Sequence, residues 1–317
     1  MAFGPSIAEA EKYASTQIGF HVAFMDYYER NGEDPLRQLA MEVSSKTAVE
    51  EHIFLGDLPG FEEWKDDRKM STLAAHKLRL ANRNWASGIR VHRNEIMDDQ
   101  LGLVMPRLQG LAAKARRHVG DLIAKVLING FSGTAYPDAG DGLGYDGSLF
   151  FSDAHVLEGG ASQDNKGTTA LTTASYEAAI MQMRALTTYD GSDPLDFNPT
   201  HLLVGPKNEF VAKRIVGQLN TVETAGDGSV TNIHYGSSKV IVSSRLSGAY
   251  DDYWFLLDLS QPVKPLIFQN REPITVASQT SWESDDMFRR GEMKFGAQAR
   301  YNVGLFDWRL VFGALVA

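Results

Sequence analysis

The sequence predicts an α+β protein in which long projecting segments accompany a mixed α/β unit. Apolar residues recur every three or four positions between about Pro106 and Asn129, which is typical of a long helix. Apolar and polar residues alternate strictly from Lys294 to Leu305, which is typical of a long strand. Short helix and strand patterns follow one another from about Ser175 to Asn270 and indicate the mixed unit.

The N-terminal part of the chain combines one helix pattern with an extended segment. Apolar residues lie at helical spacing from Pro5 to about Arg30, after which Gly32 and Pro35 interrupt the pattern. Residues 42–64 have little regular periodicity and several turn residues. We expect them to form an extended arm that wraps over another part of the protein or over a second subunit.

A projecting β-hairpin is predicted over residues 76–93, HKLRLANRNWASGIRVHR. Leu78 and Leu80 alternate with basic residues on one side of a polar centre, and Ile89 and Val91 do so on the other. The basic residues are too dense for both faces of such a hairpin to pack on its own protein.

The long helix predicted to end near Gly130 carries a basic face in an otherwise acidic chain. The charged residues of this face are Arg107, Lys114, Arg116, Arg117 and Lys125, against Asp121 alone. A formal net charge of -9 argues against a protein that coats nucleic acid with a wholly basic surface. This helix is a locally basic element in the acidic chain.

The remaining segments are assigned from their composition. Residues 131–173 are rich in Gly, Asp and Ser and predict a long irregular connection, and residues 221–237 predict a mobile loop. Cysteine is absent, which excludes disulfides and thiolate metal sites. We find no membrane-span or secretion-signal pattern, and therefore expect a cytoplasmic product.

The heptapeptide LFFSDAH, residues 149–155, is a candidate for chemistry because Ser152, Asp153 and His155 lie together. A serine hydrolase is disfavoured, since the G-x-S-x-G elbow occurs nowhere in the chain. A metal site using Asp153 and His155 remains an alternative, and a metal-dependent hydrolase is the function it implies. The interpretation we favour is a loop anchored by Phe150 and Phe151, in which the polar residues bond to backbone.

The order of elements and four motifs resemble one known family. The motifs are HIFLGDLPGFEEWKDDR, LRLANRNWASGIRVHRNEIMDDQLGL, LFFSDAH followed by Asn165, and PTHLLVGPKNEFVAKRI. In this order they resemble the Mu-like phage major head subunit (T protein) family, whose members have the HK97-like fold of tailed-phage major capsid proteins. The resemblance extends over most of the chain.

The resemblance implies a domain organisation and a structural role. It assigns residues 1–60 to an N-terminal arm, 61–98 to an extended loop, 99–171 with 276–317 to a peripheral domain with a spine helix, and 172–275 to an axial domain. It also implies pentamers and hexamers that close into an icosahedral shell around double-stranded DNA. The expected location is the virion, after synthesis and assembly in the bacterial host cytoplasm, and neither enzyme activity nor a cofactor is expected.

Partners and contact residues follow from the same resemblance. Separate scaffolding, portal and decoration proteins are expected as partners, and a membrane is not. Aromatic and arginine side chains in projecting segments are typical interface anchors, which singles out Trp64, Arg68, Trp85 and Arg90. Weak, non-specific contact with packaged DNA is expected from Lys114, Arg116 and Arg117. An encapsulin-like shell that encloses protein cargo is the alternative with the same fold.

Overall fold

The structure is a computed structural model. It describes residues 7–30, 32–54, 76–98, 104–136, 142–156, 162–188, 191, 193–222, 229–281 and 283–316. The helices are α1 (Ile7–Arg30), α2 (Arg93–Met97), α3 (Val104–Asn129), α4 (Thr173–Arg184), α5 (Glu209–Gly217) and α6 (Asp285–Arg290). Short 3-10 turns occupy Pro35–Leu39, Pro206–Asn208, Gly248–Tyr250 and Trp308–Leu310.

The strands form two larger sheets and two short ribbons. Their bounds are β1 (Ala40–Ser44), β2 (Val49–Phe54), β3 (His76–Ala81), β4 (Arg83–His92), β5 (Lys166–Gly167), β6 (His201–Val204), β7 (Asn220–Val222), β8 (Ser229–Thr231), β9 (Lys239–Val242), β10 (Trp254–Leu257), β11 (Leu266–Gln279), β12 (Glu292–Leu305) and β13 (Val311–Ala314).

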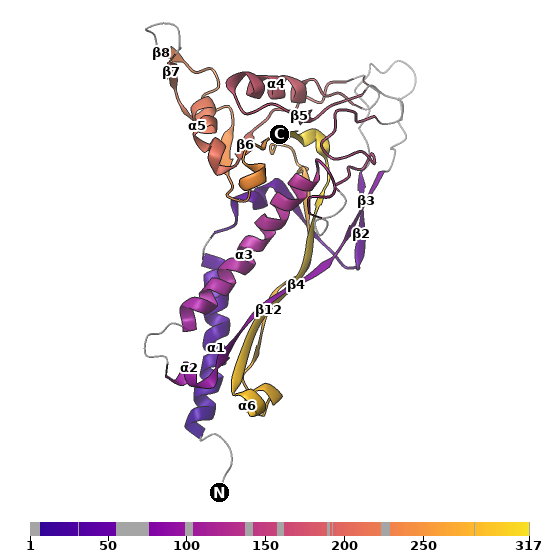
Figure 1. Ribbon diagram of the computed structural model, residues 1–317. Helices are drawn as coiled ribbons and strands as arrows, with labels where there is room; N and C mark the ends of the chain where they lie inside the picture. The colour runs from indigo at the N-terminus through magenta and orange to yellow at the C-terminus, as the bar shows by residue number, and fades with distance from the viewer. Residues whose placement is uncertain are drawn as a thin grey trace.

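A long four-stranded sheet and two long helices make up one end of the molecule. The sheet has the order β1-β11-β12-β4, and α1 and α3 lie side by side along it (Figure 1). The alternation predicted for the last long strand is present in β12, where Met293, Phe295 and Ala297 are buried among residues of α1 and α3. The helix predicted at the N-terminus and the long helix containing Pro106 are both observed.

The predicted β-hairpin over residues 76–93 is wrong in its pairing. β3 pairs with β2, and β4 pairs with β12. Only Asn82 separates β3 from β4, so the chain continues forward and cannot fold back on itself. The Asn82 side chain donates to Ser45 Oγ (2.6 Å) and to the carbonyl oxygen of Thr47 (2.7 Å), which holds β3 against the turn before β2.

A five-stranded sheet of order β5-β13-β10-β6-β9 forms the other end. Its central strands β6 and β10 are nearly continuous runs of buried residues, because α4 and α5 contribute to the same apolar core. The C-terminal strand β13 joins this sheet and not the four-stranded one. Residues 172–275, the segment assigned to an axial domain, supply β6, β9 and β10 of the sheet.

The segments expected to be an extended arm and a mobile loop both contain paired strands. The expected arm supplies β1 at the edge of the four-stranded sheet and β2 in the ribbon with β3. The expected mobile loop supplies the short pair β7 and β8, because Val222 and Val230 support extended structure beside its Gly and Asp residues. Within the described ranges, no helix is both long and apolar enough to cross a membrane.

Candidate functional site

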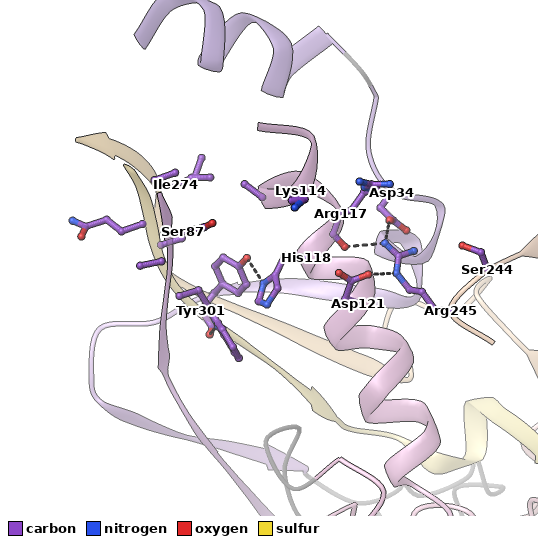
Figure 2. A pocket seen from close by; sticks show the side chains of 16 residues that line it. Asp34, Ser87, Lys114, Arg117, His118, Asp121, Ser244, Arg245, Ile274 and Tyr301 are labelled. Atoms are coloured by element: carbon purple, nitrogen blue, oxygen red, sulfur yellow. Dashed lines mark hydrogen bonds and ion pairs between the residues drawn. The ribbon is translucent and has the colours of Figure 1, made fainter. Parts of the chain in front are cut away.

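A pocket of about 620 Å³ opens beside the middle of α3, where this helix faces the four-stranded sheet and the turn after β9. Its buried lining is apolar or aromatic and includes Ala297, Ala299 and Tyr301 of β12. Its exposed lining includes the two cationic residues Lys114 and Arg117 of α3 (Figure 2). An apolar interior with a few charged groups at its edge is typical of binding sites.

The aromatic part of the pocket joins three elements. His118 of α3 is hydrogen-bonded through Nδ1 to the Tyr301 hydroxyl at 2.8 Å. The Trp85 ring of β4 lies 4.5 Å from the His118 ring, centroid to centroid, and its indole N–H donates to the Tyr301 carbonyl oxygen at 2.9 Å. Burial raises the pKa of the Tyr301 phenol, which therefore remains neutral and available for this hydrogen bond.

An acid–base cluster closes one side of the pocket. Arg245 Nη2 donates to Asp34 Oδ2 at 2.7 Å and to the carbonyl oxygen of Arg117 at 2.8 Å, and Arg245 Nε pairs with Asp121. Asp34 also caps the following 3-10 turn through a bond from the Leu36 amide. The cluster thus joins the segment after α1, the helix α3 and the turn that follows β9.

A glycine makes this cluster possible. A Cβ atom at Gly120 would lie 2.5 Å from the carboxylate of Asp34, far inside van der Waals contact. The bare backbone of α3 at this position lets Asp34 approach closely enough for Arg245 to reach both carboxylates.

The single basic face predicted for the long helix is divided. Arg116 Nη1 donates to the carbonyl oxygen of Tyr28 at 2.8 Å, so this side chain reaches toward α1. Lys125 Nζ lies 5.3 Å above the Tyr136 ring. Lys114 and Arg117 are three positions apart, share one face of the helix and line the pocket. The prediction of one shared face is wrong, because a helix separates positions 114 and 116 by more than half a turn.

Predicted inter-subunit contact residues lie in different settings. Trp64 and Arg68 fall outside the described residues. Trp85 is half-buried in the pocket. Arg90 is exposed on β4, in register with Lys294 of β12. Their contacts with other subunits stay predictions.

The heptapeptide LFFSDAH is a buried anchor. Phe150 and Phe151 are fully buried, as expected. His155 is buried as well, and its ring nitrogens bond to Asp146 Oδ2 (2.5 Å) and Asn165 Oδ1 (3.2 Å) while the ring stacks on Trp308. The expected side-chain bonds from His155 to backbone are wrong, since its partners are side chains.

The alternative metal site does not assemble in this region. Asp153 is exposed, whereas both nitrogens of the buried His155 ring are in hydrogen bonds within the chain. Within the described part of the chain, no three His, Asp or Glu side chains are placed to hold a metal ion.

Several exposed apolar side chains were not predicted from the sequence. Phe288 of α6 is 85% exposed, Ile233 is 84% exposed and Phe210 of α5 is 74% exposed. Each belongs to a short segment in which periodicity cannot separate a core position from a surface one. Apolar side chains that are scattered singly over a surface are common in soluble proteins, so these three do not by themselves mark a contact.

Comparisons with known proteins agree on one family. The family model of the Mu-like prophage major head subunit gpT matches residues 14–170, 165–246 and 242–315. The Mu-like prophage FluMu major head subunit of Haemophilus influenzae is 24% identical over 293 residues, 92% of this chain and 70% of that protein. The major capsid protein of Escherichia phage Mu is 24% identical over 273 residues, 86% of this chain and 64% of that protein. The chain therefore spans less than two thirds of the phage Mu protein.

Solved structures agree on the fold. A chain of the bacteriophage JBD30 procapsid aligns with 99% of this chain and 77% of its own length, with a TM-score of 0.56 and 22% identity. The virus-like particle from Pyrococcus furiosus aligns with 94% of this chain and 98% of its own, with a TM-score of 0.53 and 10% identity. The predicted HK97-like fold is confirmed. With the family model matching nearly the whole chain, this protein belongs to the Mu-like prophage major head subunit gpT family.

Proposed function

We propose that this chain assembles with copies of itself into pentamers and hexamers that close into an icosahedral phage head around double-stranded DNA. Its membership of the major head subunit family supports this role. We assign it a structural role without enzyme activity. The five-stranded end is its axial domain, and the four-stranded sheet with α3 is its peripheral domain.

The observation that carries the proposal is the surface of the isolated subunit. The chain has a mass of 35.0 kDa and an accessible surface of 17795 Å². A compact monomer of this mass exposes about 13,000 Å². The excess accompanies an elongated shape with the ribbon β2–β3 and the α6 end extending from it (Figure 1). Surface of this extent is expected to be buried between subunits.

The net negative charge of the subunit is consistent with a shell that holds packaged DNA only weakly. A subunit with a formal net charge of -9 gives a shell wall that repels phosphate overall. Weak contact of this kind would let packaged DNA slide, because phosphate contacts add up over many subunits. We propose that scaffolding, portal and decoration functions come from separate proteins; one JBD30 capsid structure is described as decorated with minor capsid protein trimers.

Negative-stain electron microscopy beside size-exclusion chromatography tests the proposal. We expect closed polyhedral particles, or rings of five or six subunits. A species of about 35 kDa at high protein concentration would contradict it. Nuclease-resistant DNA inside particles from infected or induced cells separates a phage head from an encapsulin-like shell, which would contain protein cargo instead.

A further inference from the structure

His155 is a buried imidazole whose two ring nitrogens both face oxygen atoms. Nδ1 lies 2.5 Å from Asp146 Oδ2, and Nε2 lies 3.2 Å from Asn165 Oδ1. A neutral imidazole has one N–H donor and one bare nitrogen, so it can donate to only one of two acceptors. The number of protons on the ring therefore follows from the chemistry of the two atoms that it faces.

The orientation of the Asn165 amide is determined by its other neighbours. Its nitrogen faces three backbone carbonyl oxygens, those of Phe150, Trp308 and Val311. Its oxygen accepts from the Ser152 amide at 3.0 Å. Exchanging the amide oxygen and nitrogen would set an oxygen against three carbonyl oxygens and an N–H against an N–H. The atom that faces His155 Nε2 is therefore an oxygen, and Nε2 carries a hydrogen.

The charge of the pair determines the state of Nδ1. The side chains of His155 and Asp146 are both 0% exposed. If Nε2 alone were protonated, the bare Nδ1 would face the carboxylate, and the pair would hold an uncompensated negative charge in the interior. A second ring proton removes this repulsion and leaves a neutral pair of imidazolium and carboxylate. The proton lies on the ring because imidazole is a stronger base than a carboxylate.

The other groups around the ring are compatible with an imidazolium. The elements packed against the ring carry five further charged residues, which are Asp153, Asp164, Lys166, Asp307 and Arg309. Within the described ranges, none of the five has a hydrogen bond or an ion pair with the ring; Asp153 is exposed, and Arg309 is paired with Asp307 at 3.1 Å. The Trp308 ring lies parallel to the His155 ring with the centroids 3.8 Å apart, and an aromatic face attracts a cation.

We propose that His155 and Asp146 form a pH-sensitive switch, in which a doubly protonated ring at neutral pH holds residues 142–156 against the C-terminal segment. Asn165 and Trp308 connect the ring to the 3-10 turn Trp308–Leu310 and to β13. Loss of the Nδ1 proton at higher pH opposes two lone pairs and buries a negative charge, which weakens this attachment. The switch lies within one subunit and does not depend on assembly.

The sign of the pH effect follows from proton binding in the two states. An ordinary histidine has a pKa of about 6.5, so the unfolded chain releases the ring proton above this pH. The folded subunit retains it and therefore binds one proton more than the unfolded chain. Stability should fall as the pH rises above about 6.5, until the folded ring also loses its proton.

Nitrogen-15 NMR of protein labelled at histidine observes the ring protons directly. The whole chain is measured by magic-angle spinning, as sedimented subunits or as particles, and His155 is identified by its contact with the Trp308 ring. We expect both ring nitrogens to be protonated at pH 8, where an ordinary histidine is almost entirely neutral. A bare nitrogen on this ring at pH 8 would overturn the proposal.

Asp146→Asn is the variant in which a neutral ring satisfies every hydrogen bond. The new amide nitrogen can donate to a bare Nδ1, while the amide oxygen keeps the bond from the Ser148 amide, which Asp146 Oδ1 accepts at 3.2 Å. We expect the variant ring to carry one proton, at Nε2. Urea denaturation measures the consequence: between pH 7.5 and 8.5 the unfolding constant of the wild type should rise about tenfold relative to that of the variant.

Asp153→Asn is the matched control, because it makes the same substitution at an exposed position two residues from His155. It should keep the pH dependence of the wild type. An identical pH dependence in the wild type and Asp146→Asn would contradict the switch. The NMR measurement needs no variant, so it decides the proposal even if Asp146→Asn does not fold.

Discussion

Asn165 in the interior and Glu50 at the start of the β2–β3 ribbon each collect three hydrogen bonds at one end of a side chain. Asn165 is buried, and the two hydrogens of its Nδ2 are shared among the carbonyl oxygens of Phe150 (2.9 Å), Trp308 (3.1 Å) and Val311 (3.1 Å). Glu50 Oε1 accepts from the amides of Lys46 (2.7 Å) and Thr47 (2.8 Å) and from Ser45 Oγ (2.9 Å).

Because the Asn165 cluster is more deeply buried than the Glu50 cluster, it should contribute more to the stability of the subunit. Carbonyl groups around Asn165 have no water to bond if the side chain is removed, so each carries a desolvation cost. Of the groups around Glu50, Ser45 is buried, but Lys46 and Thr47 are exposed, and water can replace Glu50 as the partner of their amides. Hydrogen bonds inside the body of the subunit cannot be replaced by hydrogen bonds to water. Those at the exposed turn before the projecting ribbon can be replaced in this way. Such an arrangement suits a rigid body whose extensions adapt to neighbours.

Removing the interior cluster should have the largest effect. Asn165→Ala leaves three buried carbonyl oxygens and His155 Nε2 without this partner, and we expect it to lower the free energy of unfolding by about 3 kcal/mol. Urea denaturation of the subunit measures the change. The matched control is Asn198→Ala, an exposed asparagine bonded to Arg184, which should cost less than about 0.5 kcal/mol. Equal losses in both variants would contradict the role of burial.

The cluster beside the pocket is intermediate in burial and should be intermediate in effect. Arg245→Met leaves the Asp34 carboxylate, whose side chain is 8% exposed, without its cation. Loss of a partner from a buried pair costs about 3–5 kcal/mol, and partial exposure of Arg245 reduces our expectation to about 2 kcal/mol.

Hydrogen exchange gives the local signature of this change. The amides of Asp34 and of Leu36–Leu39 should exchange faster in Arg245→Met, because the 3-10 turn loses its attachment to α3. Lys213→Met removes an exposed ion pair with Glu209 and serves as the control, with an expected cost below about 0.5 kcal/mol. Unchanged exchange over the turn would show that Arg245 does not hold it.

The sequence predicted elements well and their partners poorly. The spacing of Leu108, Leu111 and Leu122 predicted α3, and the alternation around Phe295 predicted β12, because these patterns depend on local periodicity. The alternation in β3 and β4 could not show that β3 pairs with β2. Pairing of β3 with β4 would give the same alternating pattern. Resemblance to a known family supplied the fold, which periodicity alone did not.

The candidate site was harder to predict for the same reason. Arg245 and Asp34 lie 211 positions apart, and nothing local marks either as a partner of the other. The basic residues of α3 were visible in the sequence, but their division between α1 and the pocket depends on which face α1 covers. Asn165 was noted only as a family position, because a hydrogen-bond centre joining residues 150 and 311 requires the folded chain.

Two glycines of α3 allow a smaller and sharper test. Gly120→Ala places a Cβ 2.5 Å from the Asp34 carboxylate, whereas Gly110→Ala meets nothing within 4 Å. Alanine gains about 1 kcal/mol over glycine in a helix at both positions. Displacement of Asp34 should cost about 2 kcal/mol, so we expect a net loss of about 1 kcal/mol for Gly120→Ala and a gain for Gly110→Ala. Thermal unfolding of the pair measures the difference, and stabilisation by both would contradict the close approach of Asp34.

The surface cluster should give the smallest effect, and one confined to the start of the ribbon. Hydrogen bonds from the Thr47 and Lys46 amides and the Ser45 hydroxyl lower the pKa of Glu50 from its ordinary value of 4.5 to about 2. Because the folded pKa is lower, the carboxylate contributes stability above pH 4.5 and loses it as the pH falls through about 2. In carbon-13 NMR, the Glu50 carboxyl of the subunit should hardly titrate between pH 7 and 3.5, and Glu50→Gln identifies its signal. A midpoint near 4.5 would show that the turn does not hold the carboxylate, and that the ribbon begins at a looser point than its hydrogen bonds indicate.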